Sequence, residues 1–162
     1  MDENTEELVP IPPRSTSRYN GQHSRVVDAG RLLELFRQSC SVAMESRKKD
    51  TATARFELAV ECYWQLMELS LTAEVQESVQ RVMQLLAQNF PGQVCMNAAL
   101  GLCDEANKKK TIKVQLKLLL GARDLLVEGL ARKDCNYDAI NSIYVQVVDY
   151  IKKAEELAFL LS

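Results

Sequence analysis

Between Asp28 and the end of the 162-residue sequence there is a single proline, Pro91. The whole chain holds only six glycines and four prolines, and the other three prolines lie close together near its start. Hairpin-rich β folds need frequent glycine and proline at their turns, whereas long helices tolerate neither well in their interior. The chain from Asp28 onward is therefore predicted to consist of long helices.

Hydrophobic residues recur at steps of three and four along this part of the chain, as at Leu32, Leu33 and Phe36. This is the spacing of one face of an α-helix. Phe90-Pro91-Gly92 is a strong stop signal near the middle of the pattern. The periodicity predicts six helices, over residues 26–48, 51–70, 73–89, 93–107, 111–132 and 136–161.

The connections between these helices are short, which favours antiparallel neighbours. We therefore expect an all-α fold of about six antiparallel helices, arranged as a helical bundle or as a short superhelix of α-helical repeats. The helices fall into two groups of three, over residues 25–90 and 93–162. Each group is small for an independent core, so we expect the two to pack on one another in one domain, 25–162.

Residues 1–24 lack helical periodicity and are acidic, with Pro, Ser and Asn among them. This composition predicts a flexible tail. Within it, Val-Pro-Ile-Pro-Pro-Arg at residues 9–14 has two interpretations. It is either a plain linker or a polyproline II segment that serves as the ligand of an adaptor.

The charged residues are balanced, with 20 Lys and Arg against 22 Asp and Glu. Nucleic-acid binders concentrate positive charge, so no nucleic-acid partner is expected. The basic runs at residues 47–49 and at Lys108, Lys109 and Lys110 lie near predicted helix ends, where cations offset the helix dipole. The alternative is a patch that attracts an acidic partner. No stretch approaches 18 apolar residues, so no integral membrane helix is expected.

Catalytic and metal-binding patterns are missing from the sequence. The one histidine, His23, lies in the tail, and the glycines are scattered singly and form no phosphate loop. The five cysteines have neither CxxC nor Cys–His zinc spacing and fall within or beside apolar helical patterns. We expect a non-enzymatic protein without cofactor or metal, in a reducing compartment. A cytoplasmic location is predicted, and the nucleus is not excluded.

Two stretches carry a family resemblance. Phe56-x-x-Ala59-x-x-x-Tyr63 resembles the helix motif of three-helix MIT domains (microtubule-interacting and trafficking modules) and of TPR hairpins. Residues 137–144 resemble a second copy, and residues 149–157 are similar to the end of the third MIT helix. The resemblance implies two MIT-like units in tandem, as in the C-terminal regions of autophagy-initiating protein kinases. In this chain one predicted helix carries both of the later patterns.

The function that these features favour is protein–protein interaction, as an adaptor or scaffold. A groove between helices would receive a partner's peptide or amphipathic helix. Three alternatives stay open: a homo-oligomerising structural bundle, a module that binds lipid surfaces, and a regulatory tandem-MIT-like domain of a larger trafficking or autophagy protein.

Trp64 is the only tryptophan and directly follows Tyr63. Adjacent helix residues cannot face the same stripe, so Trp64 either packs between two helices or anchors a partner. The groove is expected beside the second helix or along the last one. The candidate partner-binding residues are Phe56, Tyr63, Trp64 and Met67 on the second helix, Tyr144, Val148 and Lys152 on the last, and Lys108, Lys109 and Lys110, which would steer an acidic partner.

Gly101, Gly121 and Gly129 each lie inside a predicted helix. Glycine there costs about 1 kcal/mol relative to alanine. These glycines either let two helices approach closely or leave a shallow groove.

Overall fold

The computed structural model describes residues 10–14, 28–132 and 136–162. Within these residues the chain forms five α-helices and no strand, which confirms the predicted all-α class. The four helices other than the longest begin and end within three residues of their predicted bounds. The helices are α1 (Ala29–Glu45), α2 (Lys49–Met67), α3 (Ala73–Lys108), α4 (Ile112–Ala131) and α5 (Tyr137–Leu161).

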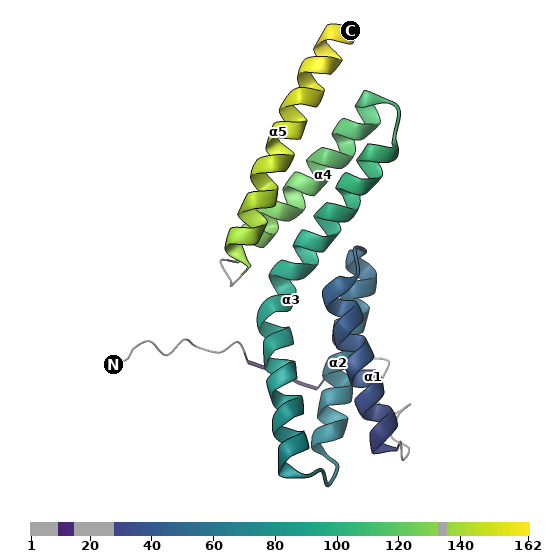
Figure 1. Cartoon of the computed structure of the whole chain (residues 1–162), viewed down its shortest axis with the longest axis vertical. Coiled ribbons are helices and arrows are strands. Elements are labelled where there is room, and N and C mark those ends of the chain that lie inside the picture. Colours follow the sequence, from purple (N-terminus) through teal and green to yellow (C-terminus); the bar gives the residue numbers. More distant parts are fainter. Residues whose placement is uncertain (1–9, 15–27, 133–135) are drawn as a thin grey trace, which may run out of the picture.

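The prediction of six helices is wrong by one, because α3 runs through Phe90-Pro91-Gly92 without a break. Pro91 has no N–H to donate to the carbonyl of Ala87, one turn earlier, and α3 changes direction midway along its length (Figure 1). Phe90, Gly92 and Val94 are buried on both sides of the proline. Packing of these neighbours therefore outweighs the local stop signal. At 36 residues, α3 is about 54 Å long.

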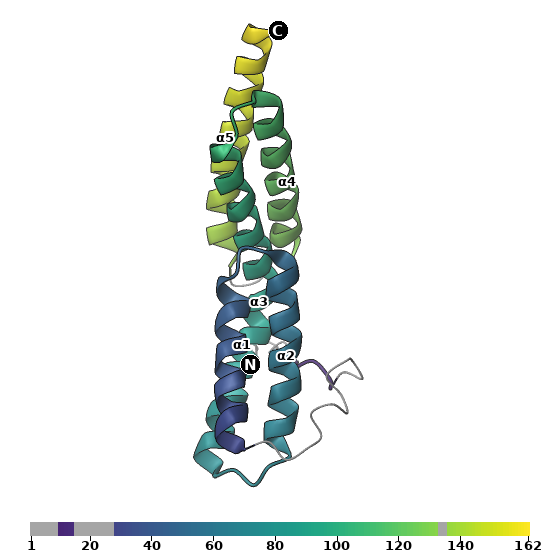
Figure 2. The ribbon, with the colours of Figure 1, turned by 90° about the vertical axis from the view of Figure 1, so that its right-hand side faces the viewer.

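The helices form two three-helix bundles that are stacked end to end and share α3 (Figures 1 and 2). In the N-terminal bundle, α1 and α2 pack on the first half of α3. In the C-terminal bundle, α4 and α5 pack on its second half. The two groups of helices continue one another along α3 (Figure 1).

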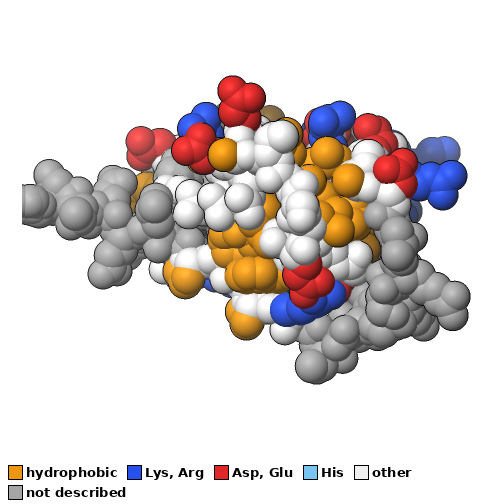
Figure 3. Space-filling model, turned by 90° about the horizontal axis from the view of Figure 1, so that it is seen from below, with side chains coloured by type: hydrophobic (Ala, Val, Ile, Leu, Met, Phe, Trp, Pro, Cys, Tyr) orange, Lys and Arg blue, Asp and Glu red, His pale blue; other side chains and the backbone are white. Residues whose placement is uncertain are grey.

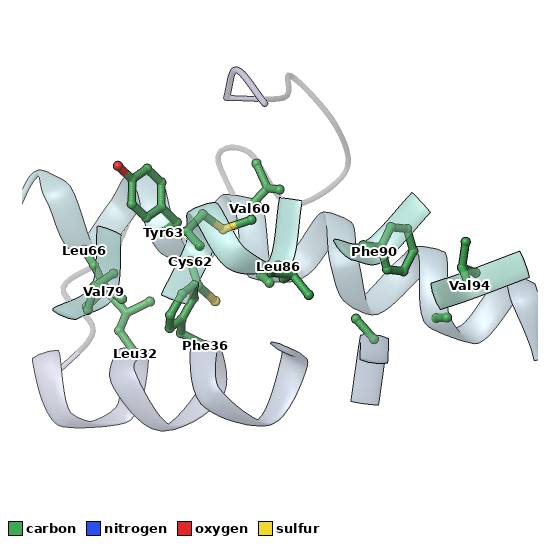
Figure 4. Packing of buried hydrophobic residues seen from close by; sticks show 14 of the residues in the cluster. Leu32, Phe36, Val60, Cys62, Tyr63, Leu66, Val79, Leu86, Phe90 and Val94 are labelled. Atoms are coloured by element: carbon green, nitrogen blue, oxygen red, sulfur yellow. The ribbon is translucent and has the colours of Figure 1, made fainter. Parts of the chain in front are cut away.

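Each bundle has its own hydrophobic core. The core of the N-terminal bundle includes Phe36, Leu66 and Leu86, from α1, α2 and α3 (Figure 4). The core of the C-terminal bundle includes Leu126 from α4 and Ile140 from α5. Because both cores draw on α3, the shared helix is stabilised along most of its length.

The end of α1 and the turn that follows it contact α3 at the junction of the two bundles. Asn97 of α3 is buried, and its Nδ2 donates to the carbonyl oxygen of Met44 at 2.7 Å. Arg47 forms an ion pair with Asp104. At Gly101 an added Cβ would lie 2.9 Å from the carbonyl oxygen of Arg47. Close approach is thus the role of this glycine.

Candidate functional site

Residues 10–14, which belong to the predicted tail, lie against α2 (Figure 2, purple segment). The remaining residues of that tail, 1–9 and 15–24, are outside the described part of the chain. Ile11 is half-buried and packs against the N-terminal core. We call residues 10–14 the docked segment.

Four polar or amphipathic side chains at the C-terminal end of α2 form the surface on which the docked segment lies. Glu61, Trp64, Gln65 and Glu68 are spaced i, i+3, i+4 and i+7, so they share one face of the helix. We call these four residues the α2 site. Glu61 is the buried member, with a side chain only 2% exposed, whereas Glu68 lies at the surface.

The guanidinium of Arg14 joins the two carboxylates of this site. Its Nε and Nη2 both donate to Oε2 of Glu61, at 3.1 and 2.9 Å, and its Nη1 donates to Glu68. Gln65 donates to the same oxygen of Glu61 at 3.1 Å. The hydrogen bonds and the charge of Glu61 raise the pKa of Arg14. Arg14 is therefore fully charged wherever the protein is folded.

The second oxygen of Glu61 is not used in this arrangement. Among the described residues no group donates to Oε1, although the atom is buried. A buried carboxylate oxygen without a donor costs free energy, so it marks a place where a further donor would be stabilised.

Trp64 contacts the backbone of the docked segment. Its indole Nε1 donates to the carbonyl oxygen of Pro12 at 2.8 Å. The ring packs edge-on against Tyr63, with 4.8 Å between ring centroids and an interplanar angle of 76°. Trp64 is half-buried, with its polar edge on the docked segment and its apolar surface on the core.

Five consecutive residues of α2, Ala59 to Tyr63, are all buried. Successive residues of a helix point about 100° apart, so this run is covered around the whole circumference of the helix. Helices α1 and α3 cover two sides. The docked segment covers the side of Glu61.

The other candidate residues of the second helix belong mainly to the core. Tyr63 is buried, and Met67 is half-buried against the N-terminal core. Phe56 stacks on Phe90 of α3, with 4.3 Å between ring centroids and 9° between ring planes. Of these candidates, only Trp64 contacts the docked segment through a hydrogen bond.

The remaining candidates lie in the C-terminal half of the molecule. Lys108, Lys109 and Lys110 are exposed at the end of α3 and in the turn that follows. On α5, Tyr144 is half-buried and the side chains of Val148 and Lys152 are exposed. The structure does not bring these residues together with Trp64, because α5 packs in the other bundle.

Sequence reasoning missed Arg14, Glu61 and Glu68. Glu61 carried a signal, because it is the one charged residue in the run from Leu58 to Trp64. Arg14 carried a weaker signal, because it is a cation that directly follows the prolines at residues 10, 12 and 13.

Four grooves in the described part of the chain lie outside the α2 site, and two of them lie between helices of one bundle. One, of about 380 Å³, runs between α3, α4 and α5 and is lined by Leu119, Tyr150 and Leu157. The other, of about 270 Å³, lies between α1 and the start of α3, beside Phe36 and Val79. At that end of the molecule, hydrophobic side chains gather centrally with charged ones around them (Figure 3).

The four described cysteines are free thiols in buried or half-buried positions. Burial raises the pKa of Cys40 and of Cys62 to about 12, so these thiols are protonated at neutral pH and are poor nucleophiles. Cys135 and His23 lie outside the described residues. No group of three metal-ligating side chains occurs in the part of the chain that the structure covers.

None of the described helices is both long and apolar enough to cross a bilayer. No known protein family, characterised protein or solved structure matches the sequence or the fold. The functional argument therefore depends on the geometry of the α2 site.

Proposed function

We propose that the chain is a non-enzymatic protein-interaction module that binds an extended peptide of a partner protein along the α2 site. The observation that supports this function is the docked segment itself. It is a short non-helical stretch of chain that the α2 site holds through side chains suited to peptide recognition.

The contact of Trp64 with Pro12 follows the physics of proline-rich recognition. Proline-rich segments form few internal hydrogen bonds, so their carbonyl oxygens are available to external donors. An indole offers one N–H donor on a large apolar ring, and domains that bind such segments use aromatic grooves of this kind. In this chain, the indole N–H of Trp64 takes that role at 2.8 Å.

The acidic pair adds a charge requirement. An arginine reaches Glu61 through two nitrogens and Glu68 through a third, so an arginine-bearing peptide satisfies both carboxylates at once. An acidic or neutral peptide would leave Glu61 buried without a cation, which is costly. The α2 site therefore selects for basic peptides, in contrast to the acidic partner that the lysine runs suggested.

A homo-oligomerising bundle is the second candidate function, because the end of α5 exposes several large apolar side chains. Phe159, Leu160 and Leu161 are each more than 70% exposed. Self-association through this end would appear as a mass that rises with protein concentration in light scattering. The MIT-like and TPR-like resemblances are compatible with either candidate.

Peptide binding to the full chain tests the proposed function. The probe is a fluorescein-labelled peptide of residues 8–15, Leu-Val-Pro-Ile-Pro-Pro-Arg-Ser, followed by anisotropy. The protein carries Arg14→Glu, which places a third carboxylate against Glu61 and Glu68 and releases the chain's own segment. We expect saturable binding with a Kd in the range of about 10–100 μM, typical of a contact of this size.

Two further substitutions assign that binding to the α2 site. In the Arg14→Glu chain, Trp64→Phe removes the indole donor and Glu61→Gln removes the buried charge, and each is expected to weaken binding about tenfold or more. Glu77→Gln, an exposed glutamate of α3, is the matched control and should change nothing. Binding that survives both α2 substitutions would place the peptide elsewhere, and no binding at all would refute the proposed function.

A further inference from the structure

We propose that the docked segment is a built-in competing ligand, so that the α2 site accepts only partners that carry an aliphatic-Pro-x-Arg sequence and displace residues 10–14. This inference rests on the proposed function and names the partner sequence and the regulation of the same site.

The partner sequence follows from the three contacts of the docked segment. Ile11 packs against the core, the carbonyl of Pro12 accepts from Trp64, and Arg14 pairs with the two glutamates. Pro13 is exposed, so its position tolerates other residues. The required pattern is an aliphatic residue, proline, any residue, then arginine.

Arginine is required at the last position because its guanidinium contacts two carboxylates at the same time. Nε and Nη2 converge on one oxygen of Glu61, while Nη1 reaches Glu68, which directly follows the last residue of α2. A lysine ammonium is a single point charge and cannot reproduce these three donors in one plane. A partner with lysine therefore loses one of the two carboxylates.

The unused oxygen of Glu61 supports exchange at this site. Oε1 is buried and has no donor among the described residues while the chain's own segment is bound. The docked segment therefore leaves part of the site unsatisfied. A partner that supplies one further N–H or O–H to this oxygen binds better than the internal ligand and can displace it.

Tethering sets the strength of the competition. Residues 15–28 join the segment to α1 in the same chain, so its binding is intramolecular, with an effective concentration on the order of millimolar. Against a peptide with a Kd of about 100 μM, this competition lowers the apparent affinity about tenfold.

The test compares the wild-type chain with the Arg14→Glu variant, using the labelled peptide of residues 8–15 and the same peptide with lysine in place of arginine. We expect the arginine peptide to bind the variant about tenfold more tightly than the wild type. The lysine peptide should bind the variant at least tenfold more weakly than the arginine peptide. Circular dichroism verifies that the variant keeps its helices.

The outcomes separate this inference from the proposed function. Equal affinity of the wild type and the variant for the arginine peptide would overturn the built-in competitor and leave peptide binding intact. Equal affinity of the two peptides would overturn the requirement for arginine. A wild-type dimer that Arg14→Glu converts to a monomer would show that a second copy supplies the segment, which also overturns the internal competitor. Failure of both peptides to bind the variant would refute the proposed function itself.

Discussion

Gly101→Ala tests how the two bundles are held together. In an ordinary helix this change stabilises the protein by about 1 kcal/mol, because alanine has the higher helix propensity. At Gly101 the new Cβ would lie 2.9 Å from the carbonyl oxygen of Arg47 and 3.2 Å from its Cβ. Those atoms belong to the turn between α1 and α2, so backbone must move to make room.

Overpacking of this kind costs typically 1–3 kcal/mol. Set against the gain in helix propensity, the expected net loss of stability is about 1 kcal/mol, with the melting temperature lowered by about 2–4 °C. The assay is urea unfolding followed by far-UV circular dichroism, with Trp64 fluorescence as a second signal that reports on the N-terminal bundle alone.

Gly121→Ala is the matched control. Its added Cβ would meet only the terminal Cδ1 of Leu102, at 3.3 Å, and that methyl group can rotate away. This variant should be as stable as the wild type or slightly more so. If Gly101→Ala proves as stable as Gly121→Ala, the turn does not press on α3 and the reasoning about the junction is refuted.

Three further predictions concern the interior. Asn97→Ala removes the buried amide that donates to Met44 in the last turn of α1 and should lower the free energy of unfolding by about 1–3 kcal/mol in the same urea assay. Phe56→Leu removes one ring of a stacked pair and should cost about 1 kcal/mol, seen as a lower urea midpoint. Burial raises the thiol pKa values of Cys40 and Cys62 to about 12, so both thiols should resist iodoacetamide at pH 8 until urea unfolds the chain. Rapid labelling of the folded chain, mapped by mass spectrometry, would contradict this.

The sequence predicted the helices well where periodicity was the only signal, as in α1, α4 and α5. The prediction of a helix end at Pro91 was wrong because a proline–glycine stop signal reflects only the local preference of the chain. Whether a helix ends there depends on what its two halves pack against. Phe90 and Val94 are buried against other helices, and that packing, which no local pattern encodes, keeps α3 continuous.

The candidate site was half predictable. The second helix and Trp64 were identified because a lone tryptophan beside a tyrosine cannot join the same stripe. The partner of Trp64 was not identified, because Arg14 is 47 residues from Glu61 and their pairing depends on tertiary structure. A glutamate inside an apolar run predicts that a cation covers it, but not which one.

The energetics of the docked segment fit an exchangeable ligand. The indole hydrogen bond contributes about 1 kcal/mol, the charge-assisted bonds to buried Glu61 about 2.5, the exposed pair with Glu68 about 0.5 and the half-buried Ile11 about 1. Ordering the segment costs about 3.5 kcal/mol, which is low for five residues because three are prolines with φ already fixed.

The net preference for the docked state is then about 1.5 kcal/mol, which corresponds to roughly tenfold in the equilibrium constant. A preference of this size keeps the α2 site covered in most molecules, and leaves about one in ten open at any moment. It agrees with the tenfold competition expected from tethering alone. A segment that bound much more tightly would close the site to partners, and one that bound more weakly would leave the site open. The low ordering cost of the three prolines and the ion pairs of Arg14 give the docked segment a binding free energy between these two cases.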